Sequence, residues 1–200
     1  MFEKQWFKLG LISLAVLNIT ACIEEEIPDI SLESVPQAEF KVTFPEALAI
    51  AEAMVDGKQA YSMELEKEDG QPVIEVGIDG QEIFVHAVTG EIVSIDDLRG
   101  TDDQEDLEEI TEFLQLQSLA TVPILEALQT GEAFADEQAH TVELENEDGN
   151  LVYEVVVGRQ EIYVDAGTGQ VLYTEGGAGG NETEQASSIQ VPGDDNDDDE

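Results

Sequence analysis

The chain contains one 30-residue stretch twice. Residues 64–93 and 143–172 align without a gap at an offset of 79, and 16 of the 30 positions are identical, where chance gives roughly two or three. Substituted positions keep their size and polarity, as in Phe84 against Tyr163. Self-similarity of this kind is the signature of a duplicated structural unit. The sequence therefore predicts two copies of one fold.

The first copy begins with a helix start signal. Thr43-Phe44-Pro45-Glu46 places a Thr cap three residues before a Glu, with a Pro in the first turn, a pattern typical of a helix N-terminus. Two-residue turns such as Asp69-Gly70 then connect short alternating runs, and connections this short force neighbouring strands to be antiparallel. The predicted strands are residues 61–66, 72–78, 81–86 and 91–95.

The second copy repeats this pattern. Thr121-Val122-Pro123 stands at its helix start, and its predicted strands are residues 141–146, 151–157, 160–165 and 170–173. We expect an α+β fold of two tandem units, repeat 1 (residues 41–97) and repeat 2 (residues 121–174), each with one helix packed on a four-stranded antiparallel meander. The pattern leaves open whether the two units share one sheet or pack as separate domains.

Two further segments flank repeat 2. Residues 98–120 read as an acidic linker followed by an amphipathic helix over residues 106–119, because Leu107, Ile110 and Phe113 recur at helical spacing. We expect this helix to pack between the repeats or to cover one sheet. Residues 175–200 are rich in Gly, Ser and Glu and end in an acidic run, a composition that cannot bury a core and predicts a disordered tail.

The N-terminus has the pattern of a bacterial lipoprotein signal. Lys4 and Lys8 precede an apolar run at residues 9–19, which is too short to span a bilayer, and Ala21 is followed by Cys22. We expect residues 1–21 to be a signal peptide, Cys22 to be lipidated and to anchor the protein in the membrane, and residues 22–40 to be a tether. The alternative is that an ordinary signal peptidase cuts nearby and Cys22 is incidental. Because Ile23 follows the cysteine, Gram-negative sorting would favour the outer membrane, on its periplasmic or surface face.

The charge of the chain restricts its partners. There are 47 acidic residues against 7 Lys and Arg, a formal net charge of −40. Nucleic acid is excluded as a partner because phosphate binding needs clusters of Lys and Arg. Salt relieves the self-repulsion of such a chain, so we expect a marine or salt-loving source, the alternative being a functional cation-binding surface. A single cysteine allows no intramolecular disulfide.

No catalytic or metal-binding motif is present. The only histidines are His86 and His140, and we interpret both as surface or turn residues. Carboxylate pairs such as Glu64/Glu66 and Glu143/Glu145 are interpreted as a solvated face, because acidic residues occur throughout the chain. The tail resembles part of a calcium loop but lacks its central Gly and its final Glu. We therefore expect no cofactor and no metal site beyond weak Ca²⁺ binding by the tail, and no enzymatic activity.

Several segments together resemble the PepSY domain family. They are Pro45 to Leu48, Glu64 to Gly70, Val152 to Val155 and Tyr163 to Gly169. The resemblance covers residues 43–96 and 121–174, and repeat 2 is the closer copy because repeat 1 departs from the pattern at Ile74 and His86. It implies a cystatin-like fold, a helix on an antiparallel sheet. It also implies a role in inhibiting or modulating a peptidase of the cell envelope, without catalytic residues.

These observations lead to one functional expectation and one alternative. We expect a non-enzymatic, lipid-anchored and monomeric envelope protein that inhibits or assists an envelope or secreted peptidase. It would dock through an exposed sheet edge or through the two hairpin tips with their flanking strands, since edge strands offer unpaired backbone groups. The candidate binding residues are Glu68, Asp69 and Gly70 in repeat 1 and Glu147, Asp148 and Gly149 in repeat 2. The alternative is an acidic structural or divalent-cation-binding surface lipoprotein with no peptidase partner.

Overall fold

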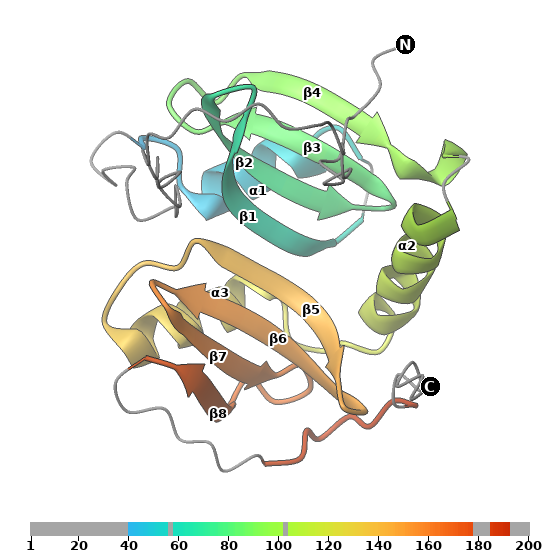
Figure 1. Cartoon of the computed structure of the whole chain (residues 1–200), viewed down its shortest axis with the longest axis vertical. Helices are drawn as coiled ribbons and strands as arrows, with labels where there is room; N and C mark the ends of the chain where they lie inside the picture. The colour runs from blue at the N-terminus through green and yellow to red at the C-terminus, as the bar shows by residue number, and fades with distance from the viewer. Residues whose placement is uncertain (1–39, 56–57, 102–103, 178–184, 193–200) are drawn as a thin grey trace, which may run out of the picture. The chain divides into compact units, whose positions relative to one another are not determined.

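Repeat 1 folds as one helix and a four-stranded meander. The computed structural model describes residues 40–55, 58–101, 104–177 and 185–192, and Figure 1 shows their arrangement. The elements of repeat 1 are α1 (Phe44–Glu52), β1 (Ala60–Glu68), β2 (Gln71–Ile78), β3 (Gln81–His86) and β4 (Ile92–Asp97). The predicted capping box forms: Glu46 N donates to Thr43 Oγ1, and Thr43 N donates to Glu46 Oε2. Asp69 and Gly70 adopt the positive φ angles, 51° and 79°, that a tight hairpin requires.

Repeat 2 has the same element order. It contains α3 (Ile124–Ala135), β5 (Thr141–Glu147), β6 (Asn150–Val157), β7 (Gln160–Asp165) and β8 (Val171–Gly176). Its helix start differs from that of α1, because Ile124 stands where repeat 1 has Glu46 and no capping box is available. Thr121 Oγ1 instead donates to the carbonyl of Gly167 (2.8 Å), and Pro123 precedes the helix. The predicted α+β fold, with two tandem units of one helix on a four-stranded meander, is confirmed.

The two repeats share one eight-stranded sheet. Its strand order is β4-β3-β2-β1-β5-β6-β7-β8, with all neighbours antiparallel. Met63 of β1 lies opposite Val142 of β5, and these two residues occupy equivalent positions of the repeats. The pairs on either side, Ser62–Glu143 and Glu64–Thr141, are likewise exchanged by the offset of 79. The repeats are therefore related by a pseudo-two-fold axis through the centre of the sheet.

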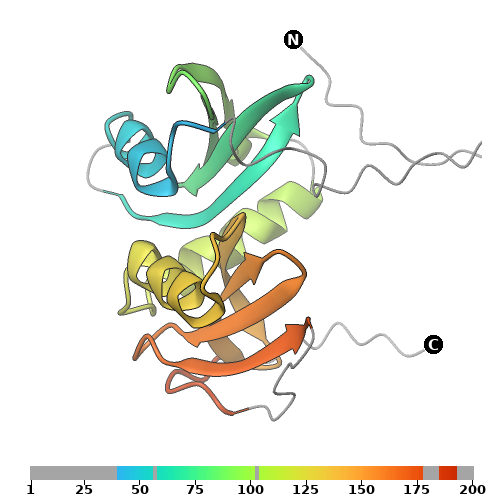
Figure 2. The ribbon, with the colours of Figure 1, turned by 90° about the vertical axis from the view of Figure 1, so that its left-hand side faces the viewer.

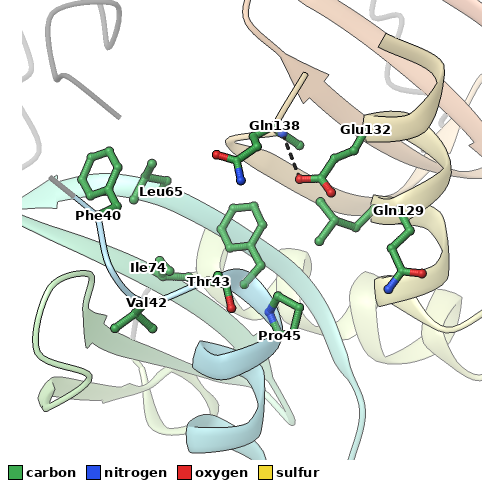
Figure 3. Close-up of a pocket in the computed structure, with 12 residues that line it drawn as sticks. Phe40, Val42, Thr43, Pro45, Leu65, Ile74, Gln129, Glu132 and Gln138 are labelled. Atoms are coloured by element: carbon green, nitrogen blue, oxygen red, sulfur yellow. Dashed lines mark hydrogen bonds between the residues drawn. The ribbon is translucent and has the colours of Figure 1, made fainter. Parts of the chain in front are cut away.

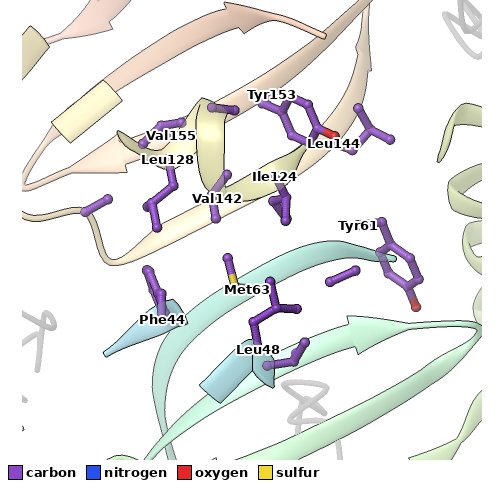
Figure 4. Packing of buried hydrophobic residues seen from close by; sticks show 14 of the residues in the cluster. Phe44, Leu48, Tyr61, Met63, Ile124, Leu128, Val142, Leu144, Tyr153 and Val155 are labelled. Carbon is purple, nitrogen blue, oxygen red and sulfur yellow. The ribbon is translucent and has the colours of Figure 1, made fainter. Parts of the chain in front are cut away.

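Both repeat helices lie on the same face of this sheet (Figure 2). We call this the helix face and the opposite one the open face. Residues on the helix face form one hydrophobic cluster that crosses the boundary between the repeats (Figure 4). Met63 and Val142 are fully buried at its centre, with Phe44 and Leu128 contributed by the two helices. Because burial of apolar area is the main stabilising contribution to folding, the repeats stabilise one another.

The segment between the repeats contains a short 3-10 helix, η3 (Leu98–Gly100), and the predicted amphipathic helix, α2 (Gln104–Gln117). The ring of Phe113 stacks on Tyr61 of β1, with centroids 4.6 Å apart. Leu116 is 6% exposed and belongs to the shared hydrophobic cluster. Since α2 also packs against β5, it contacts both repeats, which is the first of the two packings expected for it.

Part of the C-terminal region departs from the expected disordered tail. Residues 185–192 lie against repeat 2, where Gln190 forms an antiparallel bridge with Asn150. Leu151 N donates to Ile189 O (3.1 Å) and Val191 N donates to Gly149 O (2.9 Å). The expectation was wrong for this segment. Composition describes the tail as a whole, whereas a few of its residues form hydrogen bonds with repeat 2. Residues 178–184 and 193–200 lie outside the described residues.

The N-terminal predictions concern a part of the chain that the structure leaves undescribed. The signal peptide, Cys22 and the tether up to residue 39 all lie there. Within the described part of the chain, no helix has both the length and the apolar character needed to cross a membrane.

Candidate functional site

A groove with a volume of about 330 Å³ lies between the repeats on the helix face. Figure 3 shows how it is built: the chain entering α1 and the first turn of that helix form one wall, and α3 forms the other. Leu65 of β1 and Ile74 of β2 form its floor, and Leu128 of α3 contributes a further apolar surface. Phe40 and Val42 complete the wall beside α1. The groove is thus lined largely by apolar side chains.

Four polar residues line the groove, and two of them are hydrogen-bonded within the fold. Glu132 Oε1 accepts a hydrogen bond from Ala139 N (3.2 Å), and Thr43 Oγ1 donates to the Glu46 carboxylate (2.9 Å). Gln129 and Gln138 are exposed. An apolar floor with a few polar groups around it suits recognition of a ligand. Thr43 is the only hydroxyl-bearing residue of the lining, and its bond to Glu46 serves the helix cap.

The pseudo-two-fold axis places a second cleft on the other side of the β1–β5 pair, and α2 lies there. Gln59, the equivalent of the groove residue Gln138, accepts a hydrogen bond from the side chain of Gln117 through its carbonyl. Leu144 and Tyr153, the equivalents of Leu65 and Ile74, are buried in the cluster that includes Leu116 of α2. The molecule therefore has two equivalent clefts, one filled by its own helix and one that forms the groove.

The two predicted hairpin tips lie at opposite ends of the central strands (Figure 1), because β1 and β5 run antiparallel. Asp69 and Gly70 are exposed, whereas Gly149 is buried and its carbonyl accepts from Val191 of the C-terminal segment. The strands that flank these tips are the four central strands of the sheet, and its edges are β4 and β8. The expectation that the flanking strands offer a free sheet edge was therefore wrong, since pairing between the repeats was not visible in the sequence.

Glutamates on the four central strands gather on the open face of the sheet. The cross-strand pairs Glu64–Glu75 and Glu143–Glu154 lie on either side of the pseudo-two-fold axis. Burial, and then repulsion from Glu154, raises the pKa of Glu145, and burial also raises the pKa of Glu154. Burial likewise raises the pKa of Glu64, and repulsion from Glu66 raises it further. The predicted solvated face is thus partly buried and electrostatically crowded.

Asp165 anchors the C-terminal segment. It is 3% exposed, and its Oδ1 accepts hydrogen bonds from Gly167 N (2.7 Å) and Ser188 Oγ (2.7 Å) while its Oδ2 accepts one from Ser188 N (2.9 Å). Burial alone would raise the pKa of Asp165, but the hydrogen bonds from Ser188 and from the turn outweigh it and lower that pKa. The carboxylate therefore fixes both its own turn and the segment docked on it.

His86 occupies the equivalent place in repeat 1. Its Nδ1 accepts a hydrogen bond from Val88 N (3.1 Å), so it closes the same turn as Asp165 does. Val88 stands where repeat 2 has Gly167, and a Cβ at position 167 would collide with Ser188. Repeat 1 thus cannot hold such a segment in the same way. His140, in contrast, contacts the carbonyl of Gly158 through Nε2 (3.2 Å).

The remaining predicted sites lie elsewhere or outside the described part of the chain. Among the described residues no group of three His, Cys, Asp or Glu side chains could hold a metal ion. Cys22 and the acidic run of the tail are outside those residues. Sequence reasoning missed the groove and the docked segment. The offset between the repeats was the one sequence signal that could have indicated two related positions, because it aligns α2 with residues 26–39.

Comparisons with known proteins identify the repeats. The sequence profile described as "Peptidase propeptide and YPEB domain", or PepSY, matches residues 41–96 and 121–175. A comparison with curated protein sequences finds no match. A crystal structure of a candidate lipoprotein from Clostridium difficile 630 is 19% identical, with a TM-score of 0.44, and the alignment covers 68% of this chain and 93% of that one.

Proposed function

The chain belongs to the PepSY family, and from this premise we propose that it is a non-enzymatic, lipid-anchored envelope protein that binds a peptidase and changes its activity. The observation that carries the proposal is the apolar groove between the two repeats. Its walls come from both PepSY units, so only the complete pair forms it. The description of the family as a peptidase propeptide domain supports a peptidase as the partner.

The binding role is supported by what the groove offers. An apolar cavity of this size with a few polar groups at its rim is suited to an anchoring side chain of another protein. Two of the polar lining residues, Glu132 and Thr43, are already hydrogen-bonded within the fold. The groove therefore binds by burial of apolar area, and the peptidase reaction takes place in the partner.

The peptidase role is tested with envelope fractions of the source cells. Peptidase activity on casein is measured with the gene deleted, then restored with the natural chain or with Gln129→Trp, which places an indole at the groove. We expect deletion to change the activity severalfold, the natural chain to reverse this, and the variant to fail although it is present in equal amount. Unchanged proteolysis after deletion would contradict the proposal.

The lipid anchor is tested separately at Cys22. We expect Cys22→Ala to abolish incorporation of labelled palmitate and to move the protein from the membrane fraction to the soluble fraction, because two or more acyl chains are needed for stable anchoring. Cys22→Ser serves as the conservative control and should behave in the same way. Retention of the label in either variant would place the anchor elsewhere.

The alternative function, a divalent-cation-binding surface lipoprotein, has one observation in its favour. The glutamates of the open face crowd one another, as the raised pKa of Glu145 indicates, and a bound cation would relieve that repulsion. Calorimetry with Ca²⁺ on the natural chain and on Glu145→Gln tests this alternative, because the variant removes one carboxylate of the cluster. Saturable binding at low millimolar Ca²⁺ or below would favour the alternative.

A further inference from the structure

We propose that the groove binds an amphipathic helix of the partner, in the way that α2 fills the equivalent cleft on the other side of the central strands. The inference rests on the proposed function, since it specifies the part of the partner that is recognised. The inference follows from the internal symmetry of the molecule. The same kind of cleft occurs twice, and in one of the two clefts the occupant is a helix.

The occupied cleft defines the contacts that a helix makes there. Phe113 of α2 stacks on Tyr61 with ring planes 9° apart, and Leu116, three residues later, enters the shared hydrophobic cluster. Gln117 then donates from its side chain to the carbonyl of Gln59. Residues three and four apart lie on one face of a helix. The cleft thus recognises a pattern on one face of the helix. It consists of an aromatic residue, an aliphatic residue three positions later and a polar residue directly after that.

The groove offers a corresponding surface that is drawn from both repeats. His140, which stands at the position of Tyr61, does not line it. Gln138 stands at the position of Gln59, and the apolar floor of Leu65 and Ile74 corresponds to Leu144 and Tyr153. Leu65 is only partly buried, whereas Leu144 is fully buried. Strand β5, which carries Leu144, packs against α2. In the described part of the chain no helix takes the equivalent place beside Leu65.

The sequence of α2 is not repeated at the equivalent place before repeat 1. When the repeats are aligned on Thr43 and Thr121, residues 26–39 stand at the place of α2. This stretch carries Pro28 and Pro36, and Pro36 corresponds to Leu114 in the interior of α2. A proline inside a helix costs about 3 kcal/mol or more, because its ring clashes with the preceding turn and it lacks a backbone donor. A helix from another protein is therefore the occupant that the groove favours.

The charge of the chain adds a second requirement on this helix. With a net charge of −40, the protein attracts basic partners and repels acidic ones over a distance of about 8 Å at physiological salt. Glu132 lies at the rim of the groove. We therefore infer a helix with an apolar stripe toward the groove and Lys or Arg on its remaining surface.

The test uses a 14-residue peptide with the sequence of α2 (Gln104–Gln117) and the changes Glu105→Lys, Glu108→Lys and Glu112→Lys, titrated into the full mature chain. We expect saturable binding with a gain of peptide helicity by circular dichroism, since isolated helices of this length are marginal in water. A peptide that also carries Phe113→Asp and Leu116→Asp should bind at least tenfold more weakly. Equal binding of the two peptides would reduce the interaction to charge and overturn the proposal.

Variants of the protein locate the site. Gln129→Trp, at an exposed lining position of α3, should weaken peptide binding at least tenfold, whereas Phe134→Trp, an exposed position of the same helix that does not line the groove, should leave it unchanged. Equal effects of the two variants would overturn the assignment. A tenfold gain in affinity after deletion of residues 23–39 would also overturn it, because the chain's own segment would then be the occupant. Since these titrations contain no peptidase, their outcome is independent of the proteolysis assay.

Discussion

At the scale of single residues, two carboxyl groups on the open face oppose folding. Glu145 of β5 lies diagonally across from Glu154 of β6, because Glu143 pairs directly with Glu154 and Glu145 with Val152. Burial and mutual repulsion raise the pKa of Glu145 above its ordinary 4.5. The folded state therefore holds a proton more tightly than the unfolded state does, and the free energy of unfolding falls as pH rises above that value.

We expect Glu145→Gln to stabilise the protein at pH 8 by about 1 kcal/mol, a value reduced by solvent screening of these partly exposed groups. It should also flatten the decline of stability between pH 5 and pH 8. Urea unfolding of the natural chain and the variant at several pH values measures both effects. Glu112→Gln, an exposed position of α2, is the control and should change neither. A decline in the Glu145→Gln variant as steep as that of the natural chain would contradict the explanation.

Asp165 has the opposite effect. Its lowered pKa means that its contribution to stability is present above the ordinary value of 3.8 and is lost as pH falls through the lowered one. We expect Asp165→Ala to destabilise repeat 2 by about 2–4 kcal/mol, because several buried N–H and O–H donors lose their acceptor. Hydrogen exchange at Ser188 and Val191 should accelerate at the same time.

The matched control for Asp165 is its equivalent in repeat 1. His86→Ala removes an acceptor from the same turn but leaves the C-terminal segment in place. Exchange at Ser188 should therefore stay slow in His86→Ala. If Asp165→Ala left that exchange slow as well, Asp165 would not be the anchor of the segment.

At the scale of elements, the approach of α3 to the sheet depends on one glycine. A Cβ at Gly131 would lie 2.5 Å from Val155 Cγ1 of β6, too close for any ordinary contact. Ala favours a helix by about 1 kcal/mol over Gly, yet we expect Gly131→Ala to destabilise the protein by about 1–3 kcal/mol through overpacking. Adding Val155→Ala should recover part of this loss in thermal unfolding. Failure of the second change to compensate would indicate that α3 already has room to move.

At the scale of the whole molecule, the repeats should unfold as one cooperative unit. They share the β1–β5 pairing, the hydrophobic cluster around Met63 and Val142, and α2. We expect one calorimetric transition whose van't Hoff enthalpy equals the measured enthalpy. Met63→Asp buries a charge at the centre of this interface and should abolish the single transition. Two transitions in the natural chain would show that each repeat folds independently.

Salt should stabilise the molecule. The net charge of −40 makes the folded state repel itself, and added salt screens this repulsion. We expect the thermal midpoint to rise by several degrees, on the order of the shift from 1–2 kcal/mol, between about 0.05 and 1 M NaCl. The comparison of sodium chloride with sucrose at equal osmolarity separates screening from solvent exclusion. A flat response to salt would contradict this account of the acidity.

Much of the architecture follows from local patterns in the sequence. The capping box at Thr43 and Glu46, the Asp-Gly turns and the alternating strands are each determined by residues close in the chain, and the structure has them within about three residues of the predicted bounds. The duplication likewise established that two equivalent units exist. These features depend on backbone conformation and hydrogen bonds over a few residues.

Only the tertiary structure decided how the two units combine. The local sequence around Met63 and Val142 does not indicate that these residues pair across a pseudo-two-fold axis. The same alternation of side chains would also suit a strand at the edge of a sheet. That pairing makes β1 and β5 the centre of one sheet and creates two equivalent clefts. The linker helix α2 fills one cleft, and the groove is the other. The sequence by itself thus determined the unit and its repetition, while long-range packing decided the surface on which the proposed function depends.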